Sequence, residues 1–210
     1  MKTVRYIILL FLVAFQLPVF AQSVDAEALL DKVAAGIKAD APVRMDYSYK
    51  VYDEDGELLQ VDKGLLCVDN ERYALLMENM MVWCNGATQW SYMREIDEIY
   101  VTDASADEAQ NLSPLYVVEC YREGYDASLT DKGTCWFVEL HAADEGADVQ
   151  CVQLLVSKSD KRLEAMFIYM PGQGKIEVLL DGYTPRYGVS ADAFECPLGE
   201  FPGVEVIDMR

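Results

Sequence analysis

The sequence predicts a mainly β (α+β) protein, in which one leading helix precedes a large antiparallel sheet that is curled or nearly closed. Two patterns predict this fold class. The spacing of apolar residues is helical near the start and changes to strict alternation after Pro42. Turn signals then separate short alternating segments almost to the end of the chain. With 52% hydrophobic and 25% charged residues among 210, the chain has the composition of a globular protein and not of a disordered one.

Residues 1–21 are predicted to be a secretory signal peptide. Lys2 and Arg5 form a short basic region, an apolar run over residues 7–15 follows, and cleavage is expected after Ala21. The apolar run is shorter than the ~20 residues that a membrane-spanning helix needs. We therefore expect residues 22–210 to form a single exported domain without stable membrane insertion.

The first element of that domain is a predicted helix over residues 24–38. Ser23 or Asp25 is positioned to cap it. Its apolar residues recur at helical spacing and form one stripe, consisting of Ala26, Leu29, Leu30, Val33 and Ile37.

The strands begin after Pro42. Residues 45–52 alternate between apolar and polar side chains, which is typical of a half-buried strand. Further strands are predicted at 57–68, 72–84, 88–93, 97–102, 134–142, 149–157, 162–170 and 174–183. The turns between them are indicated by Asp55-Gly56, Asn85-Gly86, Lys132-Gly133, Glu145-Gly146, Ser159-Asp160 and residues 171–174.

The segment 72–84 is apolar on both of its predicted faces. Tyr73, Leu75 and Met77 alternate with Ala74 and Leu76. A sheet with water on one side shows a cleaner alternation of apolar and polar residues. Either helices cover both faces here, or one face lines a pocket for an apolar ligand.

A short helix is predicted within residues 112–121. Ser113 is a suitable cap and Pro114 a suitable first residue. Leu115, Tyr116 and Val118 help to make this helix apolar nearly all round, so it needs apolar contacts on both sides. It is either a plug in a packed core or a lid over an apolar cavity.

The charges and the reactive residues exclude several classes of function. A formal net charge of −19 opposes binding to nucleic acids and to anionic membrane surfaces. The single histidine, His141, has no nearby Ser or Cys signature, and the chain after Ala21 has no Gly-x-Ser-x-Gly motif, so we expect no enzyme. The six cysteines lack a C-x-x-C motif, and we expect neither a metal nor a cofactor. In an oxidising compartment they allow up to three disulfides, or they serve as small core residues.

Several motifs, taken in order, resemble the LolA-like family of periplasmic outer-membrane lipoprotein carrier proteins. They are residues 30–33 in the first helix, Gly64 and Leu65, the hairpin with Asn85-Gly86, Trp90 and Tyr92, residues 111–118, and the closing element at 194–208. The resemblance implies an incompletely closed antiparallel β-barrel, with the N-terminal helix and a short lid helix over a hydrophobic cavity.

The resemblance also implies a function and a site. Such carriers are monomers in the periplasm that shield the acyl chains of lipoproteins. The carriers receive lipoproteins from an inner-membrane lipoprotein-releasing complex and pass them to an outer-membrane receptor. The cavity is expected to be lined by Leu30, Tyr47, Tyr49, Val51, Tyr73, Leu75 and Met77, and the lid to consist of Pro114, Leu115, Tyr116 and Val118.

The chain departs from the family at Asp69 and Asn70, where the family has a basic residue and a proline. The family's basic residue helps to hold the lid closed, and here Arg72 or Arg44 is the candidate for that role. The departure favours a second hypothesis, a lipid- or lipoprotein-sensing binding module on the same fold. A structural domain with a filled core is a third.

Overall fold

The computed structural model describes residues 22–105, 124–190 and 192–210. Within them lie one α-helix, twelve strands and a short 3₁₀ helix. In chain order they are α1 (Gln22–Asp40), β1 (Val43–Tyr52), β2 (Leu58–Asp69), β3 (Arg72–Leu76), β4 (Met80–Cys84), β5 (Thr88–Met93), β6 (Glu98–Asp103), β7 (Tyr125–Lys132), β8 (Cys135–Ala142), β9 (Cys151–Ser157), β10 (Leu163–Met170), β11 (Gly174–Thr184), η3 (Leu198–Glu200) and β12 (Glu205–Asp208).

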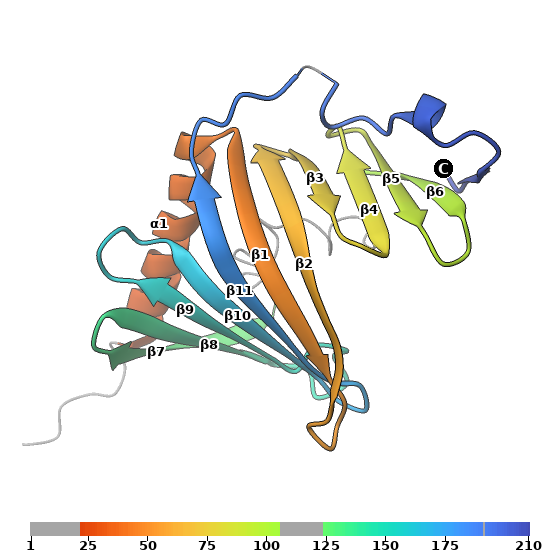
Figure 1. Ribbon diagram of the computed structural model, residues 1–210. Coiled ribbons are helices and arrows are strands. Elements are labelled where there is room, and N and C mark those ends of the chain that lie inside the picture. Colours follow the sequence, from red (N-terminus) through yellow and green to blue (C-terminus); the bar gives the residue numbers. More distant parts are fainter. Residues whose placement is uncertain (1–21, 106–123, 191) are drawn as a thin grey trace, which may run out of the picture.

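All twelve strands belong to one sheet, in the order β12-β6-β5-β4-β3-β2-β1-β11-β10-β9-β8-β7. Two meanders, β1–β6 and β7–β11, meet where β1 pairs with β11 in the middle of the sheet. Every neighbouring pair is antiparallel except β12 and β6, which are parallel. The sheet is strongly curved, and its edge strands β7 and β12 do not pair, so the predicted curled and incompletely closed sheet is confirmed (Figure 1).

Helix α1 packs against one face of this sheet. The predicted apolar stripe of the helix is confirmed, because Ala26, Leu29, Leu30, Val33 and Ile37 are all buried. They share a core with inward-facing residues of the first strands and of β8 and β9, such as Val43, Val68, Leu140 and Leu154. The burial of these apolar side chains fixes the helix on this face.

The C-terminal segment covers the opposite face of β3–β6. Phe194 is 1% exposed and lies in a second core together with Trp83, Tyr92 and Ile99. Phe201 packs on the rings of Trp83 and Tyr92, with ring centroids 5.9 and 4.7 Å apart. The two-sided apolar character of this region therefore has a structural cause. The C-terminal segment, and not a helix, covers one face of β3 and β4, whereas the other face contributes to the core beside α1 and lines an apolar pocket with Leu75 and Met80.

Three predictions about the elements need correction. The segment 72–84 is a hairpin and not one strand, because β3 and β4 turn at Glu78 and Asn79 and the Met77 amide donates to the Met80 carbonyl at 2.9 Å. Strands β7 and β12 were not predicted. Their side chains are mixed in character, and edge strands need only one pairing partner.

Other predictions fall partly or wholly outside the described residues. The predicted signal peptide and the predicted short helix with Pro114, Leu115, Tyr116 and Val118 lie there, as does Cys120. The five described cysteines, Cys67, Cys84, Cys135, Cys151 and Cys196, are free thiols, so no disulfide joins any two of them. No helix in the described parts of the chain is long and apolar enough to cross a membrane.

Candidate functional site

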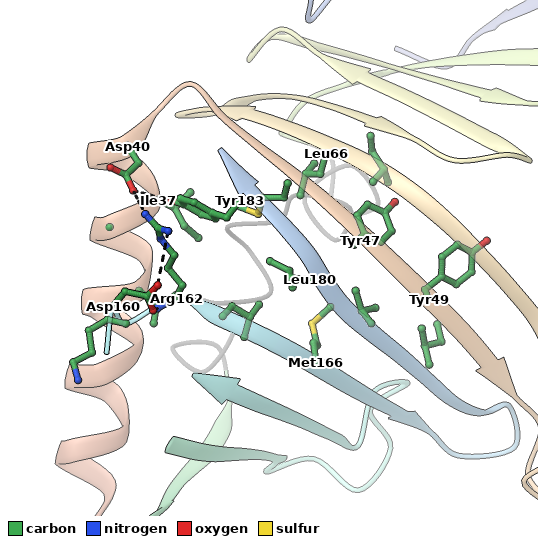
Figure 2. Close-up of a pocket in the computed structure, with 18 of the residues that line it drawn as sticks. Ile37, Asp40, Tyr47, Tyr49, Leu66, Asp160, Arg162, Met166, Leu180 and Tyr183 are labelled. Carbon is green, nitrogen blue, oxygen red and sulfur yellow. Dashed lines mark hydrogen bonds and ion pairs between the residues drawn. The ribbon is translucent and has the colours of Figure 1, made fainter. Parts of the chain in front are cut away.

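An open pocket of about 370 Å³ lies between α1 and the concave face of β1, β10 and β11 (Figure 2). This volume lies within the ~300–1,000 Å³ range of small-molecule sites. Most of its wall is apolar and includes Val33, Ile37, Met45, Leu66, Leu75, Met77, Met80, Leu163, Met166, Ile176, Val178 and Leu180. The predicted cavity thus has an apolar counterpart among the described residues.

The wall follows from the alternation of side chains along paired strands. Tyr47 lies opposite Leu180, and Tyr49 opposite Val178, which in turn lies opposite Met166. Because side chains of paired residues point to the same face of a sheet, this row continues across three strands. Four of the lining residues are methionines, which come from β1, β4, β10 and the turn between β3 and β4, and their flexible thioethers adapt to ligands of varied shape.

A polar cluster forms the end of the pocket beside α1. The Tyr183 hydroxyl donates to Asp40 Oδ2 at 3.1 Å, and Arg162 Nη2 lies 3.7 Å from the same oxygen. Arg162 also pairs with Asp160 at 3.8 Å and stacks over the Tyr183 ring, with 4.1 Å from its Cζ to the ring centroid (Figure 2). Burial and the bond to Asp40 raise the pKa of Tyr183 to about 12. This cluster ties the end of α1 to β11 and to the β9–β10 turn.

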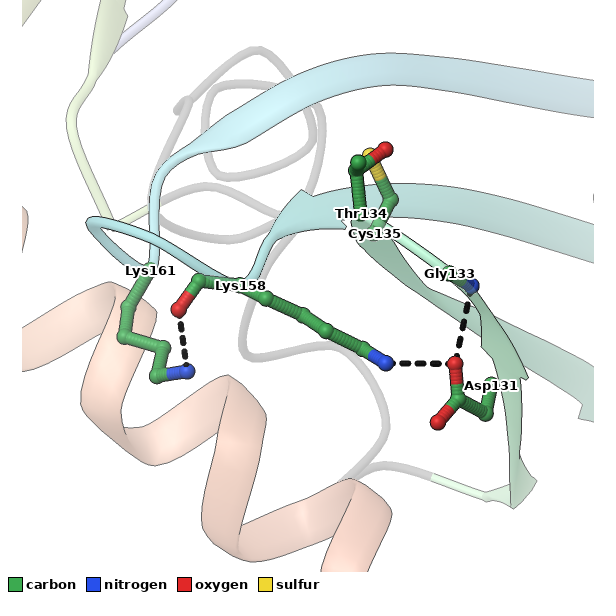
Figure 3. A network of polar contacts seen from close by, with 6 residues as sticks. All are labelled: Asp131, Gly133, Thr134, Cys135, Lys158 and Lys161. Carbon is green, nitrogen blue, oxygen red and sulfur yellow. Dashed lines mark hydrogen bonds and ion pairs between the residues drawn. The ribbon is translucent and has the colours of Figure 1, made fainter.

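The β9–β10 turn is itself anchored to the β7–β8 turn (Figure 3). The Lys158 ammonium pairs with Asp131, which also accepts a hydrogen bond from the Gly133 amide at 2.8 Å, and these bonds lower the pKa of Asp131. Lys158 Nζ lies 4.1 Å from the centroid of the Trp136 ring, and Lys161 Nζ donates to the Lys158 carbonyl at 2.7 Å. The network holds the turn that carries Asp160, Lys161 and Arg162 at the pocket.

Two tyrosines line the side of the pocket formed by β1. The Tyr49 hydroxyl accepts a hydrogen bond from Gln60 Nε2 at 2.8 Å and donates to Asp62 Oδ2 at 3.4 Å. The Tyr47 ring lies across Gly64 of β2, so a Cβ at that position would overlap the ring. Gly64 therefore explains the Gly-x-Leu motif found in the sequence, because only glycine leaves room for Tyr47.

The structure divides the seven predicted cavity residues into two groups. Four line the pocket: Tyr47, Tyr49, Leu75 and Met77. Leu30 and Tyr73 are buried in the adjoining core and do not line it, and Val51 is half-buried beyond its end. The residues predicted from the sequence did not include the lining residues from α1, β10 and β11 or the cation Arg162. The alternation of side chains in residues 174–180 indicated a strand with one apolar face, but it did not reveal that this strand pairs with β1 and β10.

The departure at Asp69 and Asn70 has a local explanation. Asn70 adopts a left-handed backbone conformation with φ 57°, which the ring of a proline forbids. Asp69 pairs with Arg72, whose guanidinium lies 4.9 Å from the centroid of the Phe194 ring. Arg44 pairs with Asp46 at 2.8 Å and donates to the Tyr187 hydroxyl at 3.3 Å. Both candidate arginines therefore contact the C-terminal segment, and the arginine that lines the pocket is Arg162.

The described lining of the pocket is mainly apolar, with charged side chains at the end beside α1. Its described lining residues include no serine, threonine, cysteine or histidine. Across the described parts of the chain, no group of three His, Cys, Asp or Glu side chains is arranged to hold a metal ion. What the lining offers a ligand is a large apolar surface with a few polar groups at its ends.

Residues 17–169 match the family model of the outer membrane lipoprotein carrier protein LolA. The chain belongs to this family. The match extends from the region of α1 to β10, so β11, which supplies one wall of the pocket, and the C-terminal segment lie beyond it. No curated protein matches the chain at a significant level.

The chain is similar to solved structures of low sequence identity. An uncharacterized conserved protein from Thermus thermophilus is 10% identical, with a TM-score of 0.54 over 88% of this chain and 99% of that one. A LolA superfamily protein from Nitrosomonas europaea is also 10% identical, with a TM-score of 0.46 over 81% and 97% of the two chains. The first of these likenesses shows that the two chains share a fold.

Proposed function

We propose that this protein is a periplasmic carrier that shields the acyl chains of lipoproteins during their transfer from the inner to the outer membrane. The observation that carries the proposal is the apolar pocket between α1 and the concave face of a LolA-like sheet. The family and this pocket together support a lipoprotein-binding or carrier module. Transfer between the two membranes is a more specific role than lipoprotein binding.

The energetics of acyl chains require a pocket of this kind. Exposing an acyl chain to water costs about 0.8 kcal/mol per methylene, so a chain of about 15 methylenes costs on the order of 12 kcal/mol. A few contacts on a flat surface do not offset such a cost, whereas an apolar concavity does. Loading is then driven by an inner-membrane lipoprotein-releasing complex, and release depends on an outer-membrane receptor that buries the chains better.

The proposal assigns roles to segments and residues. Tyr47, Tyr49, Leu75 and Met77 contact the acyl chains from the pocket wall. Residues 1–21 direct export and are removed, and residues 22–210 act as one monomeric domain. The lid at 112–121 stays a prediction from the sequence.

Native mass spectrometry of the protein purified from its producing cells tests this function. We expect lipid adducts on the wild type and their loss in Leu180→Glu, which places a carboxylate on the apolar wall. Leu59→Glu is the matched control, because Leu59 is 65% exposed and lies outside the pocket. Far-UV circular dichroism verifies that each variant is folded. A wild type without adducts, which also takes up no lipid from vesicles, would contradict the proposal.

A second candidate is a sensor of stray lipids or lipoproteins, and the departure at Asp69 and Asn70 favours it. The family's basic residue and proline are absent there, and Asp69 pairs instead with Arg72. Depletion of the protein distinguishes the two functions. Loss of a carrier strands lipoproteins in the inner membrane, whereas loss of a sensor changes only a stress response.

A further inference from the structure

We infer that the Tyr47 hydroxyl donates a hydrogen bond to the carbonyl oxygen of the acyl linkage, ester or amide, of the bound ligand. The inference rests on the proposed function and specifies it, because it names the polar group of the ligand that the pocket recognises. An apolar wall alone does not distinguish an acylated ligand from any other oily molecule.

The hydroxyl of Tyr47 is buried and has no hydrogen-bond partner. Among the described side chains, it is the one buried nitrogen or oxygen atom in this condition. Leaving a buried polar group unpaired is unfavourable, and proteins rarely retain one without a reason. The one described exception lies in a residue that lines the pocket.

The neighbouring tyrosine shows what a purely structural hydroxyl looks like here. Tyr49 lies two residues along β1, with its ring centroid 6.5 Å from that of Tyr47. Its hydroxyl is bonded to both Gln60 and Asp62. Of the two pocket tyrosines on β1, Tyr49 thus has hydrogen-bond partners for its hydroxyl, and Tyr47 has none.

Gly64 determines where the open hydroxyl lies. The end of the Tyr47 ring occupies the space above Gly64 that any other residue would fill with its Cβ. No side-chain bond holds the hydroxyl in this position, so a small rotation of the ring toward the pocket breaks no hydrogen bond. The glycine gives the ring room, and the pocket gives the hydroxyl access to a ligand.

The hydroxyl is available as a donor. Burial, with smaller contributions from Tyr49 and Asp62, raises the pKa of Tyr47 above that of an exposed tyrosine, so the O–H stays protonated. An acyl carbonyl is the complementary group, because its oxygen accepts hydrogen bonds through two lone pairs and has no proton to donate. Both groups would be buried without a partner if they did not meet, and one hydrogen bond satisfies both.

The test compares two probes that differ only in this carbonyl. Dipalmitoylglycerol carries two ester carbonyls, and its dihexadecyl ether analogue has the same chains without them. Binding is measured by displacement of a fluorescent fatty-acid analogue from the wild type, Tyr47→Phe and Tyr49→Phe. Tyr49→Phe is the matched control, since it removes a pocket hydroxyl that already has partners.

We expect the wild type to bind the diester about 2- to 10-fold more tightly than the diether, as one buried hydrogen bond allows. Tyr47→Phe should abolish this preference with the diether affinity unchanged, and Tyr49→Phe should keep it. An equal preference in the wild type and Tyr47→Phe would overturn the inference and leave the carrier function standing. A wild type that binds neither probe would instead count against the proposed function. A wild type that binds both probes equally would also overturn the inference, and this result does not depend on the folding of any variant.

Discussion

Tyr47 and Gly64 pack against each other across two neighbouring strands, and the size of each side chain suits the other. They lie opposite each other in the β1–β2 ladder, and the tyrosine ring fills the space that the missing side chain leaves. An aromatic ring over a glycine on the neighbouring strand protects the exposed backbone of the glycine and adds apolar contact. A tyrosine at an alternating position and a glycine in a strand look unrelated in the sequence.

Replacing Gly64 with alanine should therefore be destabilising. The added Cβ would overlap the Tyr47 ring, and the stiff ring has to leave its place. We expect a loss of about 1–3 kcal/mol in the free energy of unfolding, measured by urea titration, because overpacking costs that much.

Gly36→Ala is the control for this substitution. Gly36 lies in α1, and nothing lies within 4 Å of a Cβ placed there. Alanine favours the helix over glycine by about 1 kcal/mol, so this variant should be more stable than the wild type. If Gly64→Ala were as stable as Gly36→Ala, the close packing of Tyr47 on Gly64 would be refuted.

The C-terminal segment shows how an element outside the matched family region completes the fold. It crosses from β11 to the far edge of the sheet and ends as β12 beside β6 (Figure 1). Arg44 and Arg72 contact Tyr187 and Phe194 along its path. The segment seals the face of β3–β6 that α1 does not reach.

Removal of the Phe194 ring should measure this contribution. Phe194 is fully buried, and Phe194→Ala leaves a cavity between the segment and the sheet. We expect a loss of about 3–5 kcal/mol in the free energy of unfolding. Leu198→Ala, at a position that is 47% exposed in the same segment, should change it by less than about 0.5 kcal/mol. Similar values for the two variants would show that the segment is not packed on the sheet.

The sequence predicts the helix and the strands better than it predicts which strands pair with each other. The helix and eight strand segments could be predicted because each carries its own apolar period and its own turn signals. The hairpin at 72–84 could not be divided, since Met77 and Met80 on either side of its turn continue the apolar run. Strand β7 was missed although its period is present, because Tyr125, Ala127 and Leu129 alternate with polar residues and pack against the core.

The pocket was predictable only in part, for a reason of long-range pairing. The resemblance to the LolA-like family implied Tyr47 and Tyr49 as cavity residues, and the alternation within residues 45–52 placed them on one face of a strand. Leu180 and Val178 lie beside them through pairing with a strand more than 120 residues away, and no local pattern encodes that neighbour. Leu30 and Tyr73 lie in the core that adjoins the pocket, and their neighbours cover them.

For the whole molecule, buried phenols govern the response to alkaline pH. Burial raises the pKa of Tyr47, Tyr49, Tyr73, Tyr169 and Tyr183, the last to about 12. The unfolded chain releases these protons near pH 10, whereas the folded chain retains them to higher pH. The folded state thus binds more protons in this range, and its stability falls as pH rises.

We expect the free energy of unfolding to decrease from about pH 10 to pH 12. Tyr183→Phe should show a shallower decrease, because it removes one group that titrates over this range, although its stability at pH 7 is lower through the lost bond to Asp40. Urea midpoints of both proteins at several pH values measure the two slopes. Equal slopes would contradict the role assigned to Tyr183.

The pairing of β1 with β11 in the middle of the sheet also determines when the pocket can form. β1 and β11 lie more than 120 residues apart in the sequence and form neighbouring walls of the same concavity, so the pocket is incomplete until β11 has been synthesised. Contacts of such large sequence separation form slowly. The pocket therefore becomes complete only once β11 has paired with β1.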